Sequence, residues 1–353
     1  MVRDPSFAPF WNDLASRGDR ALLFILGSSY DPRVLNAATV LSSSGILVSS
    51  LRLIEFDPGR ELPTSTPSEV TNHVSEKLSQ LFPDVTIDTI PVSMRNTEGL
   101  IIGGRRISEA FRNRSLFENI TDIVVDVTAI PKGLYFPLLR TIHALSTNTE
   151  EFPNVHVLVC DDPNVDNKIV GEGGDRAEMI HGFGAGTQLT SEFDPVAIWA
   201  PVLGEDENAQ LRKIYGSRQW RAVCPILPFP ARNPRRGDDL MLEYRQLIND
   251  EWAVEPNDIS YADEQNPFDV YSTLCRIADG YRSSLKMLGT PQIVTSSHSS
   301  KLLSLGVLLA AIDRDLGVIH VEPTGYIAQN EINEADGTGE LFEIWLSGEP
   351  YGL

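Results

Sequence analysis

Two turns in this sequence carry hydroxyl groups and a lysine in the same order, which is chemistry suited to binding an anion. The first turn contains Asp126, Thr128 and Lys132, and the second contains Thr295, Ser297, His298, Ser299 and Lys301. Hydroxyl groups donate hydrogen bonds to phosphate oxygens, and a lysine ammonium adds a positive point charge. Each turn alone could be a helix cap with a surface lysine, but the repetition favours a binding site.

A third polar turn follows the first apolar run of the chain, at residues 27–33 (GSSYDPR). The turn between a parallel strand and its helix offers backbone N–H groups to an anionic ligand. Ser28, Ser29 and Arg33 are therefore candidates to contact a phosphate or ribose group. Alternatively, Asp31 caps the following helix and Pro32 occupies its first position. One residue can serve both purposes, so the sequence leaves both roles open.

Signatures of known catalytic sites are scarce. The sequence has no G-x-x-x-x-G-K-[ST] loop, no H-E-x-x-H helix and no G-x-S-x-G elbow. His298, between two serines in a turn expected to face a ligand, is the weak candidate for a general base. Asp161 and Asp162 are further candidates for acid–base or metal chemistry, although their position also suits the end of a strand. Catalytic residues thus stay unknown, and no metal or cofactor is predicted.

Apolar runs of strand length alternate with helical patterns, which is typical of parallel α/β sheets with right-handed crossovers. In the first half, strands are expected at 21–27, 45–53, 85–92, 123–127 and 155–160, and helices at 34–41, 68–81 and 107–117. In the second half, strands are expected at 196–204, 222–226 and 318–323, helices at 205–215, 238–248 and 268–287, and a strand–turn–helix segment at 292–312. A last strand-like piece at 341–346 could complete a sheet or dock a partner.

The two lysine turns belong to a longer internal repeat. When Lys132 is aligned with Lys301, apolar strand residues match and Thr128 falls opposite Ser297. We therefore expect two Rossmann-like parallel-sheet units in tandem, related as a pseudo-repeat. The expected domains are residues 1–169 and 191–353, joined by a glycine-rich linker or flap at 170–190. Glycines at 182, 184 and 186 lack the flanking strand and helix of a dinucleotide fingerprint, so the role of the 171–186 segment stays open.

Composition limits the classes of partner. The 353 residues carry a net charge of −20, which argues against a broad nucleic-acid surface or an acidic membrane. Two arginine groups stand out and could contact phosphate, although solvated helix faces are the alternative: Arg95, Arg105, Arg106, Arg112 and Arg114, and then Arg232, Arg235 and Arg236. Three scattered cysteines, no signal-peptide pattern and no apolar run of ~18 residues lead us to expect a cytoplasmic protein without a membrane segment.

The strand ending at Gly27 with its polar loop, and the later pattern Asp126-x-Thr128-x-x-x-Lys132, resemble the CARF and SAVED sensor domains of CRISPR-associated and related anti-phage systems. The resemblance implies paired Rossmann-like units that bind cyclic oligonucleotides. By position, it implies that Thr128 and Lys132 contact the ligand opposite Ser28 and Ser29, and that Ser297 and Lys301 match them in the second half. The family's Gly-Gly after the threonine is replaced here by Ala129-Ile130, which leaves the ligand open.

These observations favour a non-catalytic sensor or accessory subunit of a prokaryotic anti-phage defence system. Its ligand would be a phosphate-bearing nucleotide or another anionic small molecule. Because the two expected halves use nearly the whole chain, it would signal to a separate protein partner, an effector or complex subunit. Two alternatives are an enzyme that acts on a phosphorylated or nucleoside substrate in the same cleft, and an interaction scaffold whose halves have lost their ligand.

Overall fold

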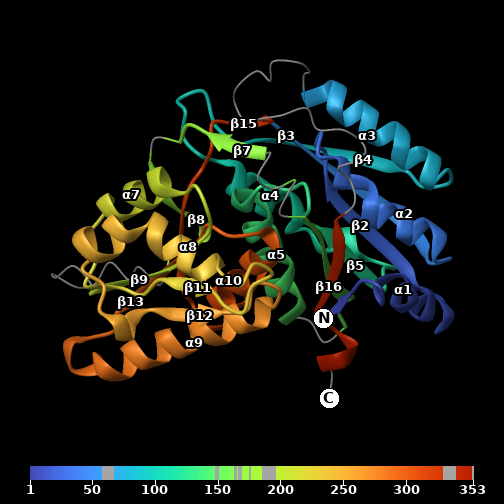
Figure 1. The fold of residues 1–353 in the computed structure, drawn as a ribbon. Coiled ribbons are helices and arrows are strands. Elements are labelled where there is room, and N and C mark those ends of the chain that lie inside the picture. Colours follow the sequence, from blue (N-terminus) through green and yellow to red (C-terminus); the bar gives the residue numbers. More distant parts are fainter. Residues whose placement is uncertain are drawn as a thin grey trace. The chain divides into compact units, whose positions relative to one another are not determined.

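The computed structural model describes residues 1–57, 67–147, 151–162, 165, 169–174, 176–184, 196–328 and 339–351 (Figure 1). The chain forms two compact units. Unit 1 comprises Met1–Gly173 together with Pro323–Leu353, and unit 2 comprises Gly174–Glu322. Among the described residues, none of the helices combines the length and apolar character that crossing a bilayer requires.

Unit 1 is built on a sheet that has seven strands among the described residues. Their order across the sheet is β1 (Val2–Arg3), β16 (Glu340–Ser347), β6 (Asn154–Asp161), β5 (Asp122–Asp126), β2 (Ala21–Gly27), β3 (Leu47–Asp57) and β4 (Ile87–Ser93). The five strands from β6 to β4 are mutually parallel, and β16 is antiparallel to β6. Numbered along the chain, the parallel strands lie in the order 3-2-1-4-5 from β4 to β6. This is a doubly wound order, and its direction reverses between β2 and β5.

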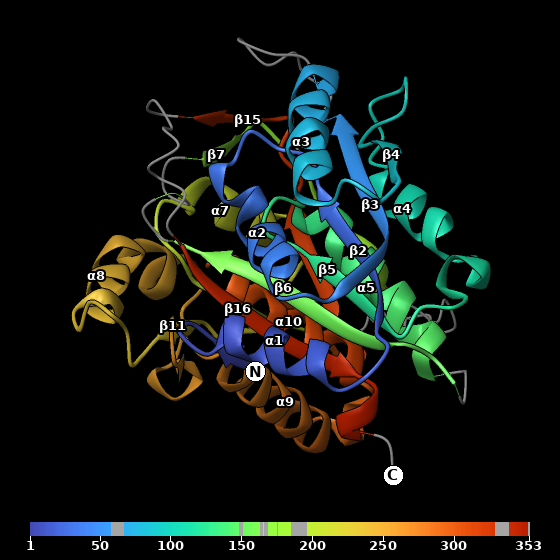
Figure 2. The ribbon, with the colours of Figure 1, turned by 90° about the vertical axis from the view of Figure 1, so that its right-hand side faces the viewer.

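Helices cover both faces of this sheet (Figures 1 and 2). One face packs on α1 (Phe7–Ser16), α2 (Asn36–Ser43) and α3 (Pro67–Leu81), and the other on α4 (Gly103–Phe111) and α5 (Lys132–Thr147). Strand β2 is buried on both sides, because Leu22, Phe24 and Leu26 join the core beneath α1–α3 while Leu23 and Ile25 point the opposite way. This explains why β2 reads as a continuous apolar run.

Unit 2 repeats the same topology. Its sheet, again seven-stranded among the described residues, has the order β12 (Ser260–Ala262), β11 (Ile226–Pro228), β9 (Ala197–Val202), β13 (Gln292–Ser297), β14 (Gly317–Val321) and β8 (Ala177–Gly184), with β10 (Ala222–Val223) also paired to β9. If β10 and β11 are counted as one interrupted strand, the parallel strands again lie in the order 3-2-1-4-5 and reverse between β9 and β13. The antiparallel strand β8 borders β14 as β16 borders β6.

The helices of unit 2 also match those of unit 1. On one face, α7 (Asn208–Gly216), α8 (Arg236–Glu243) and the π-helical segment Gln246–Glu251 pack around Trp199, and on the other α9 (Pro267–Ser284) and α10 (Lys301–Asp313) pack together. Helix α10 occupies the place of α5, since each follows the fourth strand of its sheet. The expected fold class, two Rossmann-like units related as a pseudo-repeat, is confirmed.

The expected domain boundaries change in two places. The chain end belongs to unit 1, because β16 pairs with β6 and buries Leu341, Phe342 and Ile344 there. The expected linker at 170–190 is not a loop over its first part: Ile169–Glu172 forms β7, which pairs with β15 (Gly325–Ala328), and Ala177–Gly184 forms β8. Residues 185–190 lie outside the described residues. Both strands pair with distant segments, and such long-range partners leave no local sequence pattern.

Each sheet receives its antiparallel strand from the part of the chain that follows the parallel strands of the other sheet. The segment that follows β6 provides β8, which completes the sheet of unit 2, and the segment that follows β14 provides β16, which completes the sheet of unit 1. Each half of the sequence therefore finishes the sheet of the other. As a result, the sheet of unit 1 receives β16 from a segment that follows unit 2 in the sequence, which a simple tandem arrangement would not require.

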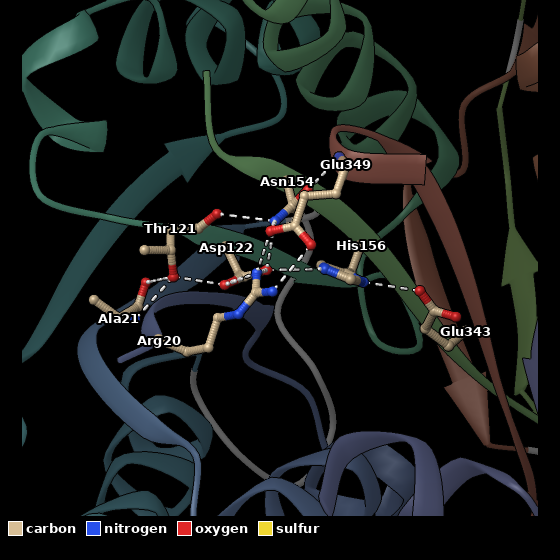
Figure 3. Close-up of polar contacts among 8 residues, drawn as sticks. All are labelled: Arg20, Ala21, Thr121, Asp122, Asn154, His156, Glu343 and Glu349. Carbon is tan, nitrogen blue, oxygen red and sulfur yellow. Dashed lines mark hydrogen bonds and ion pairs between the residues drawn. The ribbon is translucent and has the colours of Figure 1, made fainter. Parts of the chain in front are cut away.

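A buried ionic cluster fastens this last segment to unit 1 (Figure 3). His156 of β6 lies between two carboxylates, with its Nδ1 atom 2.8 Å from Glu343 of β16 and its Nε2 atom 3.3 Å from Asp122 of β5. Arg20 contacts the same Asp122 at 3.1 Å and Glu349, beyond β16, at 2.8 Å. Segments from both ends of the chain thus meet on one set of charges.

The charges of this cluster depend on one another. Burial works against protonation of His156, but the hydrogen bonds to Asp122 and Glu343 outweigh it and raise the pKa of the imidazole. Burial likewise opposes ionisation of Asp122, yet hydrogen bonds from His156 and Thr121 lower the pKa of that carboxyl. His156 therefore acts as a cation between two anions, and removing either carboxylate leaves buried charge without compensation.

We predict that Glu343→Ala lowers the free energy of unfolding by about 3 kcal/mol at pH 6, the low end for breaking a buried pair. Urea unfolding followed by circular dichroism measures this loss. Glu340→Ala is the matched control on the same strand, because Glu340 pairs with Arg3 at 4.0 Å near the surface and should cost under about 1 kcal/mol. If both variants lose the same free energy of unfolding, the ionic cluster does not stabilise the attachment of β16.

The same cluster predicts a pH dependence. The folded pKa of His156 is raised above its unfolded value of about 6.5, so its stabilisation is complete below that pH and is lost as pH rises through the folded pKa. The difference in unfolding free energy between wild type and Glu343→Ala should therefore shrink toward alkaline pH. A difference that stays constant or grows from pH 6 to pH 9 would contradict this prediction.

Candidate functional site

In both units, the strand order reverses between the first and the fourth strand. At this point a glycine at the end of the first strand touches the turn that follows the fourth strand. Gly27 ends β2, and a Cβ atom placed on it would lie 2.9 Å from Ile130 Cγ1 and 3.2 Å from the Ala129 backbone. Gly204 follows β9, and a Cβ atom there would overlap the carbonyl group of His298. Ala129 and His298 occupy the same position when the lysines are aligned. Doubly wound sheets bind ligands at this point, so these turns define the candidate sites.

We predict that Gly204→Ala destabilises the protein by about 3 kcal/mol, because the methyl group meets backbone that cannot move independently. Gly27→Ala should cost less, about 2 kcal/mol, since its methyl group presses on Ile130 Cγ1 and the Ala129 backbone at 2.9–3.2 Å and does not overlap a carbonyl group. Gly216→Ala is the control, as no heavy atom lies within 4 Å of its added Cβ, and it should be neutral or slightly stabilising. Urea unfolding of the three variants checks this ranking.

In unit 1, the expected ligand residues of the first turn serve the fold. Asp31 accepts a hydrogen bond from the backbone N–H of Arg33 and caps the 3₁₀ turn Pro32–Leu35, as the helix-start alternative predicted. The Arg33 side chain is only 2% exposed; its Nη2 atom donates to Asp31 at 2.8 Å, and its Nη1 atom to the carbonyls of Cys160 and Asp162 at 3.4 and 3.3 Å. Arg33 thus ties the first turn to the end of β6.

The other polar groups of this site are also bound inside the unit. Ser28 forms a 2.8 Å hydrogen bond with Thr71 of α3, and the Ser29 hydroxyl accepts from the Asp31 N–H. Asp126 accepts a hydrogen bond from the Thr128 N–H at 2.9 Å, and the Thr128 hydroxyl accepts one from the Cys160 N–H at 2.8 Å.

Lys132 begins α5 and is half-buried, while Ala129 and Ile130 beside it are buried. The structure therefore brings the predicted residues of unit 1 together at one sheet edge, but Ser28, Arg33, Asp126 and Thr128 have little exposed surface there.

The corresponding edge of unit 2 is built from different chemistry. The repeat positions that hold Val127, Ala129 and Ile130 in unit 1 hold Ser296, His298 and Ser299 in unit 2. Ser297 ends β13 and is buried, whereas Ser299 and Lys301 are half-buried, and the Ser300 hydroxyl caps α10 by accepting from the Leu303 N–H at 3.3 Å. The second turn is therefore polar along its whole length.

His298 belongs to a chain of hydrogen bonds that runs from the core to the surface. The Trp199 indole N–H, which can only donate, points to the Ser296 hydroxyl oxygen at 3.0 Å. The Ser296 hydroxyl is also hydrogen-bonded to His298 Nε2 at 2.9 Å. The other ring nitrogen of His298, Nδ1, faces Glu207 Oε2 at 3.5 Å. Trp199 and Ser296 thereby fix the orientation of the imidazole, and the imidazole faces Glu207.

Glu207 is the outer end of this chain. Its side chain is 25% exposed, whereas that of His298 is 2% exposed. Tyr244 holds the loop from inside, because its hydroxyl donates to the Gly204 carbonyl and accepts from the Glu207 N–H at 3.1 Å. Burial raises the pKa of Tyr244, so the hydroxyl keeps its proton for this bond. The result is a carboxylate held on a rigid loop beside the turn of β13.

Arg236 ties together the neighbouring loops of unit 2. It forms ion pairs with Glu205 after β9 and with Glu264 after β12, the latter at 3.5 Å. Of the second arginine group, Arg232 and Arg235 are exposed. In the first group, Arg105 pairs with Glu109 at 2.8 Å on the solvent side of α4, which is the solvated-helix alternative.

Asp161 and Asp162, the further catalytic candidates, lie where they contribute to the fold. Asp161 ends β6 and is buried, and the Asp162 carbonyl accepts from Arg33. Burial raises the pKa of Cys160 to about 12 and of Cys224 to about 11, so neither is a reactive thiolate at neutral pH. In the described part of the chain, no three His, Cys, Asp or Glu side chains are grouped so that they could hold a metal ion.

Sequence reasoning missed Glu207, Ser296, Trp199 and Tyr244. Ser296 and His298 are two residues apart around the end of β13, so strand alternation could have placed them on the same face. The other three gave no such signal, because Glu207 reads as part of an acidic helix start and the aromatic residues read as core.

No protein-family model matches this chain, and no curated protein matches it significantly. The resemblance to CARF and SAVED domains therefore stays a hypothesis.

Proposed function

We propose that the protein binds a nucleotide, and that it is a sensor or accessory subunit of a prokaryotic anti-phage defence system. One observation carries the binding proposal: in both units, the glycine after the first strand abuts the turn after the fourth strand, at the reversal of a 3-2-1-4-5 sheet. Folds of this kind bind nucleotides in the crevice at that point. Lysines at the first positions of α5 and α10 add support, since each places a positive charge at the turn beside the reversal.

The biological setting rests on the motif resemblance. A cyclic oligonucleotide is the ligand that this resemblance favours, and signalling then passes to a separate partner protein in the cytoplasm. The acidic surface, with a net charge of −20, fits a small ligand held locally better than a long nucleic acid.

An enzyme is the second candidate, and the chain Glu207–His298–Ser296 favours it. A carboxylate that faces an imidazole nitrogen is a common arrangement for acid–base catalysis. Ser296 and the His298 side chain are both buried, so Glu207 is the group of this chain that a substrate could reach, and His298 would act through it. Product analysis after incubation of the wild type with each nucleotide separates the two candidates, because a sensor leaves the nucleotide intact.

We predict that at least one compound from a panel of ATP, GTP, cyclic di-AMP and cyclic tetra-adenylate stabilises the full chain against heat. At 100 times the dissociation constant, the gain should be about 2.7 kcal/mol. Differential scanning fluorimetry measures it, with orthophosphate as a reference for the phosphate group alone. If none of these nucleotides shifts the melting temperature at millimolar concentration, the proposal of nucleotide binding is wrong.

A further inference from the structure

The two candidate sites differ in what a ligand can reach. At the unit 1 site, Ser29 and Lys132 are half-buried, but Arg33 and Thr128 are bound within the fold, and Ala129 and Ile130 close the turn with apolar surface. At the unit 2 site, Glu207 is partly exposed, and the half-buried Ser299 and Lys301 lie on the adjacent turn. The loops are neighbours because β9 and β13 pair up to Val202 and Ser297.

From this difference we infer that unit 2 holds the nucleotide, with Glu207 accepting hydrogen bonds from the ribose hydroxyls and His298 positioning Glu207. This inference rests on the proposed function and assigns it to one of the two sites. A carboxylate repels phosphate but accepts from hydroxyl groups, so the acidic side of the site fits the sugar. Lys301, on the turn after β13, then serves the phosphate.

The structure explains why Glu207 would be effective in that role. Its backbone is held by Tyr244, and its side chain is faced by an imidazole whose ring nitrogen atoms both have defined partners. Such a carboxylate loses little conformational freedom when a ligand binds. A rigid acceptor also discriminates strongly, because a ligand without the hydroxyl leaves its hydrogen-bonding capacity unused.

The test compares ATP with 2′,3′-dideoxy-ATP, which lacks both ribose hydroxyls, by isothermal titration calorimetry on the full chain. We expect wild type to bind ATP at least tenfold more tightly than the dideoxy compound, and Glu207→Ala to bind the two equally. Glu207→Gln, which keeps the shape and one oxygen acceptor, should be intermediate. Glu255→Ala removes the same charge from an exposed position of unit 2 and should keep the wild-type preference.

Two further variants test the positioning role and the choice of unit. His298→Ala should reduce the ATP preference severalfold, while its affinity for orthophosphate stays within a factor of two of wild type; a general loss of folding would lower both. Lys301→Ala should weaken ATP at least tenfold, whereas Lys132→Ala, the equivalent change in unit 1, should alter it less than twofold.

The outcomes separate the inference from the function on which it rests. If wild type binds neither ATP nor the other nucleotides of the panel, the proposed function fails. If wild type binds ATP but shows no preference over the dideoxy compound, or if the preference survives Glu207→Ala, then Glu207 does not contact the ribose and the inference is wrong. A tenfold loss in Lys132→Ala, with none in Lys301→Ala, would place the site in unit 1 instead.

Discussion

The close approach of a glycine to the turn across the strand reversal is the constraint on which the rest of this structure depends. At Gly27 and at Gly204, the first strand of the unit passes so near the turn after the fourth strand that a side chain would displace backbone or core atoms. The contact lies where the strand order reverses, and both candidate sites and their lysines lie beside it. The contact is repeated at equivalent residues, which supports the interpretation of the chain as a pseudo-repeat.

Within this common geometry, the two units use their polar groups differently. Unit 1 uses its polar groups to hold itself together: Arg33 joins the first turn to β6, and the His156 cluster joins the chain end to the sheet. In unit 2, the end of the fourth strand and the turn after it carry Ser296 and His298, at the repeat positions of Val127 and Ala129, and His298 faces the partly exposed Glu207. The crosswise supply of β8 and β16 links these roles through the chain, since neither half completes its own sheet. The two units therefore depend on each other's half of the chain to complete their sheets.

The repeat, the parallel sheets and the position of the turns could be predicted from the sequence, because buried strands such as β2 appear as continuous apolar runs and helix caps have local signatures. Strands that pair with distant segments could not be predicted. Strand β8 and the destination of β16 depend on partners more than a hundred residues away, and the three-residue strand β12 is too short to show a pattern. The same holds for the candidate site: the sequence predicted residues inside one turn, but not the contact between Glu207 and His298, which joins the loops after two different strands.

Hydrogen–deuterium exchange of the full chain, with and without the nucleotide that stabilises it most, tests this division most directly. If unit 2 holds the ligand at its strand reversal, amides of residues 203–208 and 298–304 will exchange more slowly in the complex, while those of 28–35 and 128–134 will keep their rates. Protection confined to the unit 1 turns, or no protection at either reversal, would contradict the account.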